Sequence, residues 1–421
     1  MRIAALTFTG LLMLISAVQA QDLSGTWQTE KPRYVMKITG SAKSGYRGEW
    51  FNLGDMDGML NGNPLIVARH GNTFTLDPVR TGGTFNGTIS ADGKTITGDW
   101  GAHDPGLLTF LRTTPQTAQA IDPSPHKVQF VTVAPGVKLE VLDWGGNGPP
   151  LVFLAGLGRT AHNFDELALK FTARHHVYAI TRRGYGVSSW PEPTDQNFDA
   201  DRMGDDVIAV LDALKIQKPV LAGHSIAGQE LSSVGTRYPE KVAGLIYLDA
   251  LFQYAFYNPA QADLALESAI IRRDLDNMFE YQGTPSKWRA LIAEIQTQLP
   301  KLQASLQRTT EMLEGAPDEQ HGPERPAART GNKIIANARR YDAAPVPMLA
   351  IAAMPRRCTP NCDKPFMKRI MDADAARLDL FEKSAPQAKV VRLANASHFI
   401  WRSNADDVVR EMNAFLDGLP H

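Results

Sequence analysis

The chain has 421 residues, 43% of them hydrophobic, and a formal net charge of -1. The length suggests two or more domains, or one large domain with an insertion, and the hydrophobic share is ample for a core. The near-neutral charge argues against a nucleic-acid-binding protein and against electrostatic attachment to an anionic membrane.

The first 20 residues have the composition of a secretory signal peptide. Arg2 gives a short positive start, an apolar stretch runs from Ile3 to Ile15, and small residues lead up to Ala20. The stretch is too short to cross a bilayer, and no other segment is long and apolar enough. We therefore expect a cleavable signal peptide over residues 1–20 and a secreted or periplasmic protein without an integral membrane span.

Residues 21–114 predict a small antiparallel β-domain. Seven short stretches rich in Thr, Val, Ile and aromatic residues alternate with turn signals. Asp92-Gly93 is the clearest hairpin turn, and residues 70–72 form a second. We expect a curved sheet or a closed barrel, and contact with a surface or a lipid is one role that we consider for it.

Aromatic residues in small β-domains usually pack in the core, so we expect this of three tryptophans: Trp27, Trp50 and Trp100. Residues 115–127 are polar and contain three prolines, which is typical of a linker between domains.

From residue 128 to 421 the pattern changes. Fully apolar strands alternate with amphipathic helices, which indicates an α/β domain whose mostly parallel sheet is covered by helices on both faces. An insertion over about residues 251–344 has no strong strand, and we expect it to form a helical cap over the strand ends. Its longest helix should bend at Pro300 and carry one apolar stripe of Leu291, Ile295, Leu299, Leu302 and Leu306.

The two cysteines, Cys358 and Cys362, are separated by three residues. Nearby cysteines of an exported protein usually pair, so we expect a disulfide. No second cysteine pair or histidine cluster accompanies them in the sequence, so we expect no metal there.

The stretch VLAGHSIAGQELS places Ser225 between an apolar strand and a helix. Such a sharp turn pushes a serine outward at the carboxyl edge of a sheet. Small residues flank it, because strand and helix approach closely there. Ala227 stands where the pattern G-x-S-x-G has its second glycine, and Gly228 comes one place late. We expect Ala227 to suffice, since that position requires only low bulk.

Four segments together resemble the α/β-hydrolase family, over roughly residue 128 to the C-terminus. FLAGLGRTAHNF is similar to its oxyanion loop, with Ala155 where a histidine usually stands and Gly156 retained. RRGYGVSS is similar to its Arg-Gly-x-Gly-x-Ser segment, and GHSIAG to its nucleophile turn. LANASHFIWRSNADDVVREMNAFL is similar to its histidine loop and last helix. The resemblance implies an α/β-hydrolase fold with a helical cap insertion.

The resemblance also implies roles for particular residues. Ser225 is the expected nucleophile and His398 the base that takes its proton. His224 adjoins the serine, but on so sharp a turn its side chain must point elsewhere. The expected oxyanion donors are the backbone amides of Leu157 and Ile226.

The acid of the triad has two candidates. Asp249 ends the strand LIYLDA, and Asp363 follows the cysteine pair. We favour Asp249 and keep Asp363 as the alternative. Other charged residues are expected to face solvent or to pack locally, and these are Arg182, Arg183, Arg356, Arg357, Asp206 and Glu230.

These features predict an exported serine hydrolase that cleaves a small-molecule carboxylic ester through an acyl-enzyme on Ser225, without a cofactor. Aromatic residues at the base of the cap suggest an apolar acyl or alcohol group, and these are Phe252, Tyr254, Phe256 and Tyr257. An amidase or aminopeptidase of the same fold, or a non-catalytic binding protein on a hydrolase scaffold, are the alternatives. A haloalkane dehalogenase or epoxide hydrolase would need an aspartate at position 225.

Overall fold

The computed structural model of the chain describes residues 21–29, 34–52, 63–79, 84–99, 107–114, 124–251, 255–256, 263–280, 284–314, 326–342, 344–357 and 365–419. The expected signal peptide, most of the linker, Trp100, both cysteines and Asp363 lie outside these residues. Within them, no helix combines the length and hydropathy that crossing a membrane requires.

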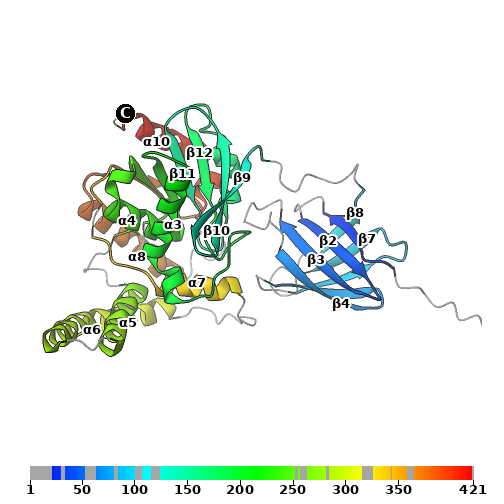
Figure 1. The fold of residues 1–421 in the computed structure, drawn as a ribbon, viewed down its shortest axis with the longest axis horizontal. Coiled ribbons are helices and arrows are strands. Elements are labelled where there is room, and N and C mark those ends of the chain that lie inside the picture. The colour runs from blue at the N-terminus through cyan, green and yellow to red at the C-terminus, as the bar shows by residue number, and fades with distance from the viewer. Residues whose placement is uncertain are drawn as a thin grey trace, which may run out of the picture.

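The N-terminal domain is a closed antiparallel barrel of eight strands (Figure 1). Its strands are β1 (Gly25–Gln28), β2 (Tyr34–Ser41), β3 (Gly45–Asn52), β4 (Asn63–His70), β5 (Thr73–Pro78), β6 (Phe85–Ile89), β7 (Thr95–Asp99) and β8 (Leu108–Arg112). The two predicted hairpin turns join β4 to β5 and β6 to β7. Trp27 and Trp50 lie in the barrel core, as predicted. The sequence patterns did not predict β8, which pairs with β1 and closes the barrel.

The second domain is built on an eight-stranded sheet in the order β16-β15-β14-β13-β11-β12-β10-β9. Strands β9 (Lys127–Ala134) and β10 (Val137–Gly145) form the predicted hairpin, and β10 runs antiparallel to its neighbour β12. The remaining strands are parallel: β11 (Pro150–Leu154), β12 (His176–Ile180), β13 (Val220–His224), β14 (Gly244–Leu248), β15 (Met348–Ala353) and β16 (Ala388–Leu393). The expected mostly parallel sheet is confirmed.

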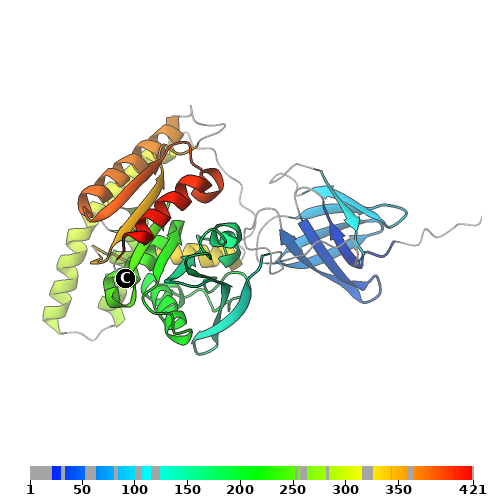
Figure 2. The same cartoon turned by 90° about the horizontal axis from the view of Figure 1, so that it is seen from above.

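Helices cover both faces of this sheet, because the central strands carry apolar side chains on both sides. One core cluster joins Tyr247 and Ala350 to helices α3 (Ala200–Ala213), α4 (Gly228–Arg237) and α8 (Pro365–Ser384). The other joins Ile246 and Ile351 to the short helix α1 (Asp165–Ala168) and to α10 (Ala405–Asp417). Figure 2 shows α8 and α10 on opposite sides of the C-terminal strands.

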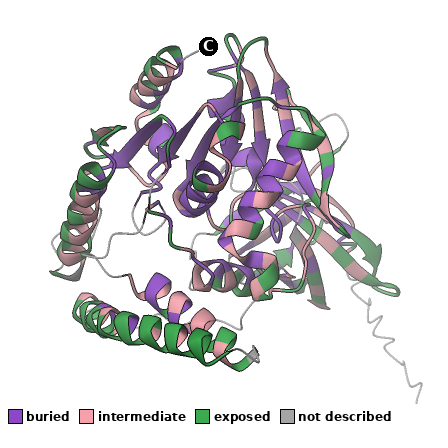
Figure 3. Cartoon of the chain, turned by 60° about the vertical axis from the view of Figure 1, so that its left-hand side comes forward, coloured by how far each residue is buried: buried purple, intermediate pink, exposed green. Residues whose placement is uncertain are grey.

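The insertion between β14 and β15 contains three helices: α5 (Leu264–Glu280), α6 (Pro285–Leu313) and α7 (Pro326–Ala336). Helix α6 continues through Pro300 and is exposed along most of its length (Figure 3). The predicted apolar stripe is wrong in part, because Leu299 and Leu306 are about half exposed. The inward positions one residue earlier, Gln298 and Ser305, are buried instead. The buried face therefore follows a seven-residue spacing along α6.

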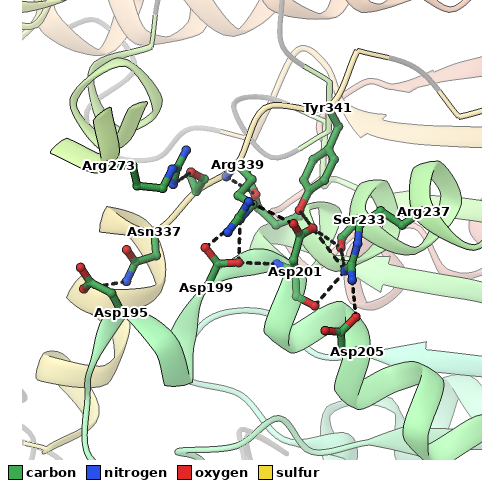
Figure 4. Close-up of polar contacts among 12 residues, drawn as sticks. Asp195, Asp199, Asp201, Asp205, Ser233, Arg237, Arg273, Asn337, Arg339 and Tyr341 are labelled. Carbon is green, nitrogen blue, oxygen red and sulfur yellow. Dashed lines mark hydrogen bonds and ion pairs between the residues drawn. The ribbon is translucent and has the colours of Figure 1, made fainter. Parts of the chain in front are cut away.

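A polar network fixes the C-terminal end of α7 to the start of α3 (Figure 4). Arg339 binds both carboxylate oxygens of Asp199 at 2.7 and 2.8 Å, and the Tyr341 hydroxyl donates to Asp201 at 2.7 Å. Asp195, on the short helix α2 (Asp195–Phe198), accepts from Asn337 at 3.2 Å. These contacts hold α7 in place against the sheet domain.

Candidate active site

Ser225 lies on a strained turn between β13 and α4. Its backbone φ is 55°, a left-handed conformation that is uncommon for a residue with a side chain. A Cβ added at Gly223 would lie 2.9 Å from the Leu231 side chain and 3.1 Å from the Cβ of Ala227. Strand and helix thus meet in contact, and the fully buried Ala227 provides the low bulk expected at the second small position.

His398 and Asp249 meet from two different loops. Asp249 directly follows β14 and is completely buried, and His398 lies on the loop after β16. The Nδ1 atom of His398 lies 2.6 Å from Asp249 Oδ2, which is a short, charge-assisted hydrogen bond. The backbone N–H of Ala353 donates to Asp249 Oδ1 at 3.0 Å, and Arg356 lies 3.2 Å from Oδ2. The carboxylate is therefore held rigidly against the imidazole ring.

His224 connects this pair to the serine turn. Its Nε2 lies 2.9 Å from the backbone oxygen of His398 and donates to it, and the centres of the two rings are 4.5 Å apart. Burial, followed by the charge of His398, holds the pKa of His224 well below its usual range, so this ring stays neutral. This hydrogen bond ties the His398 loop to the residue that precedes Ser225.

In the part of the chain that the structure describes, no hydrogen bond joins Ser225 Oγ to His398. Contacts between a nucleophile and its base often tighten only when substrate binds. An imidazole held through Nδ1 by a carboxylate can take a proton at Nε2 from a nearby hydroxyl. Ser225, Asp249 and His398 follow β13, β14 and β16, whose carboxyl ends lie at one edge of the sheet.

The loop after β11 approaches the turn from the other side. A Cβ added at Gly156 would lie 2.7 Å from His224 Nδ1 and 3.3 Å from Ser225 Cβ, so only glycine allows this approach. The side chains of Leu157 and Ile226 pack in one apolar cluster. The two predicted oxyanion residues are thus brought together at the serine turn.

Buried ion pairs support this loop, and here the sequence expectation was wrong. Arg182 is buried, binds Glu230 through two contacts of 2.5 Å, and donates to the backbone oxygens of Ala155 and Gly156 at 2.8 and 3.3 Å. Arg183 forms a second buried pair with Asp206 through two contacts of 2.6 Å. Because a buried guanidinium needs charge and hydrogen-bond partners, the carboxylates of Glu230 and Asp206 turn inward instead of facing solvent.

Helix α7 of the insertion covers the serine turn. Ile334 joins the cluster of Ile226 and Tyr185, and a Cβ added at Gly331 would lie 3.6 Å from the Leu157 side chain. The insertion therefore contributes apolar side chains that pack against the serine turn, in line with the predicted helical cap. Of the aromatic residues expected at its base, the structure describes Phe256, which stacks on Phe381 of α8 with ring centres 6.0 Å apart.

Two supporting contacts were not predicted from the sequence. Arg356 was expected in solvent, yet it reaches the Asp249 carboxylate, and Arg182 braces the loop after β11. Each partner lies far away in the chain, so no local spacing pointed to these pairs. The alternative acid Asp363 lies outside the described residues.

The comparisons with known proteins agree with this architecture. A family model described as "Alpha/beta hydrolase family" matches residues 151–411, more than half of the chain. The chain is similar to a 2-(acetamidomethylene)succinate hydrolase of Mesorhizobium japonicum, with 26% identity over 30% of this chain and 42% of that protein. It is also similar to a bifunctional esterase/perhydrolase of Acinetobacter calcoaceticus, with 33% identity over 29% of this chain and 44% of that protein.

Epoxide hydrolase A of Mycobacterium tuberculosis matches at 31% identity over 27% of this chain and 35% of that protein. The matches thus span less than half the length of these curated relatives. Among solved structures, E-2-(acetamidomethylene)succinate hydrolase aligns with a TM-score of 0.44 and 18% identity, covering 70% of this chain and all of the other. The family match, together with the sheet and its serine turn, establishes that the chain belongs to the α/β-hydrolase family.

Proposed function

We propose that the protein is a serine hydrolase that cleaves a carboxylic ester through an acyl-enzyme on Ser225. The observation that carries the proposal is the 2.6 Å hydrogen bond between His398 and a fully buried Asp249, beside the strained serine turn. A hydroxyl is a poor nucleophile until a base takes its proton, and an imidazole oriented in this way is such a base.

The proposed reaction has two halves. Ser225 Oγ attacks the acyl carbonyl while His398 Nε2 takes its proton, and Asp249 stabilises the imidazolium that forms. The backbone N–H groups of Leu157 and Ile226 donate hydrogen bonds to the carbonyl oxygen and stabilise its negative charge. His398 then gives the proton to the leaving alcohol. In the second half, His398 takes a proton from water, whose oxygen attacks the acyl carbon, and returns the proton to Ser225 Oγ as the acid is released.

The surroundings favour an apolar group on the substrate. Ile226 of the serine turn packs in one apolar cluster with Leu157, Tyr185 and two residues of α7, Ile334 and Ile335. Esterases and epoxide hydrolases both occur among the relatives. We favour ester cleavage because the residue on the turn is a serine, whereas an epoxide hydrolase would need an aspartate there.

The test is covalent labelling followed by a substrate series. The native protein should react with a fluorophosphonate probe and hydrolyse p-nitrophenyl esters, and Ser225→Ala should lose both activities. The control is Ser232→Ala, which removes a buried serine hydroxyl of α4 that contacts Tyr247. If the native protein never reacts with the probe, the protein is a binding protein instead of an enzyme. If it cleaves anilides faster than esters, it is an amidase.

We further propose export to the periplasm or beyond, on the composition of the first 20 residues. N-terminal sequencing of the secreted form should begin at Gln21. We also propose that the barrel serves attachment to a surface or lipid rather than catalysis. A protein lacking residues 21–114 should then retain hydrolysis of a small soluble ester, and loss of that activity with the fold intact would contradict this role.

A further inference from the structure

A buried cluster of two histidines and two carboxylates lies outside the catalytic groups. It combines His126, which precedes β9, with His162 and Asp165, which follow the loop after β11, and Glu140 of β10. The side chains of His126 and His162 are each 1% exposed, and that of Asp165 is 4% exposed. Burying four such groups together is costly unless their charges and lone pairs are matched.

The two histidine–carboxylate distances in this cluster are longer than a short charge-assisted hydrogen bond. His126 Nδ1 lies 3.2 Å from Asp165 Oδ1, and His162 Nδ1 lies 3.3 Å from Asp165 Oδ2. Hydrogen bonds between an imidazolium and a carboxylate are normally about 2.7–2.9 Å long. The same molecule holds such a pair, His176 and Asp143, at 2.8 Å.

The longer spacing matches the geometry of a metal centre. Zinc binds histidine nitrogen and carboxylate oxygen at about 2.0–2.2 Å, and tetrahedral coordination at those lengths separates neighbouring ligand atoms by about 3.3–3.6 Å. One ligand atom from each of His126, His162 and Asp165 can be chosen so that all lie within 4.8 Å of one another. The three residues supply one ligand atom each, and a water molecule would take the fourth position of a tetrahedral zinc.

Glu140 completes the arrangement from behind. Its Oε1 lies 3.7 Å from the other ring nitrogen of His162, Nε2, which is an ion-pair distance and longer than a hydrogen bond, and its Oε2 accepts from the Thr181 hydroxyl at 2.6 Å. A carboxylate on the far nitrogen is the usual support of a metal-binding histidine, because it fixes the ring and its tautomer. A divalent cation with two neutral histidines would also balance the charges of the two carboxylates.

We propose that His126, His162 and Asp165 form a structural zinc site, with Glu140 orienting His162. The site joins the first residues of the hydrolase domain to the short helix that follows the oxyanion loop. His126 also packs edge-on against Trp144, with ring centres 5.1 Å apart, and Trp144 donates to Ser124 at 2.9 Å. Zinc therefore holds the segment around residue 126 against the sheet and stiffens the loop that leads from Leu157.

The competing explanation is a metal-free ion pair. Burial opposes a charge on His162, but Asp165 and Glu140 outweigh it and raise the pKa of this ring to about 10. In that case the cluster holds a proton instead of a metal. Metal content distinguishes the two arrangements directly, without any assay of activity.

The experiment uses the full chain purified without a histidine tag. The protein is incubated with zinc, desalted, and analysed for metal by mass spectrometry, and its thermal unfolding is measured with zinc and with a chelator. We expect about one zinc per chain and a melting temperature several degrees higher with zinc. Cobalt should bind in its place and give the intense visible absorption of a tetrahedral centre.

The variants locate the metal. His162→Gln and His126→Gln should lose the zinc, whereas His176→Gln, which removes a histidine from a pair without a third ligand, should keep it. If His162→Gln fails to fold, His126→Gln and the zinc-dependent melting of the native protein still decide the question. Native protein without zinc, or zinc retained equally by all three variants, would overturn the proposal.

Discussion

Replacing Asp249 by asparagine tests the proposed triad most sharply. The change keeps the shape of the side chain but replaces one carboxylate oxygen by an NH2 group. The backbone N–H of Ala353 donates to Oδ1 at 3.0 Å, so the amide oxygen must remain on that side. The NH2 group then faces the Nδ1–H of His398 at 2.6 Å and the guanidinium of Arg356 at 3.2 Å, where all the groups are donors.

The imidazole can relieve this clash only by changing its tautomer. Nδ1 of His398 then accepts from the amide, and Nε2 carries the hydrogen and can no longer take a proton from Ser225. The corresponding change in a Ser-His-Asp protease lowers kcat by about 10⁴-fold. We expect a loss of the same order here, which corresponds to about 5.4 kcal/mol in activation free energy.

The assay is hydrolysis of p-nitrophenyl acetate, with fluorophosphonate labelling as a second measurement. Asp363→Asn is the matched control, because it makes the same chemical change at the alternative acid. We expect that control to stay within about threefold of the native rate. Asp249→Asn within tenfold of native, together with a collapse of Asp363→Asn, would refute the assignment of the acid and place Asp363 in the triad.

Three further predictions follow from the neighbours of the triad. Gly156→Ala should lower kcat/KM by about 10²-fold, since the new methyl group would lie 2.7 Å from His224 Nδ1 and displace it; Gly331→Ala, whose new contacts are 3.6 Å or longer, is the control. The free energy of unfolding in urea should fall as the pH drops below about 6.5, by up to about 1.4 kcal/mol per pH unit, because the depressed pKa of His224 lets the unfolded chain bind a proton that the folded chain does not. His224→Gln should flatten this pH dependence, and an unchanged slope in the variant would contradict the role of His224. Glu230→Gln should cost about 3–5 kcal/mol in unfolding free energy, because the guanidinium of Arg182 stays buried without its counter-charge; a melting temperature within 1–2 °C of native, a range of about 0.5 kcal/mol, would show that the pair contributes little.

The sequence predicted the β-domain, the α/β-hydrolase fold and the candidate site residues, for local reasons. Period-two and fully apolar stretches predicted the barrel strands and the parallel sheet, since each depends on residues adjacent in the chain. The Gly-His-Ser stretch predicted the turn at Ser225, and the order of strands placed His398 at the same edge. The strand end at Asp249 was one of two candidates for the acid; its carboxylate lies 2.6 Å from His398 Nδ1, and the other candidate, Asp363, lies outside the described residues.

Tertiary structure decided the contacts between residues that are distant in the chain. The inward turn of Glu230, the approach of Arg356 to Asp249 and the burial of Gln298 on α6 all depend on which faces meet, and periodicity alone leaves that open. The convergence of His126 with His162 has the same origin. A sequence fixes the local period and the turns of each segment, but a buried charge finds its partner only when separate segments pack together and exclude water.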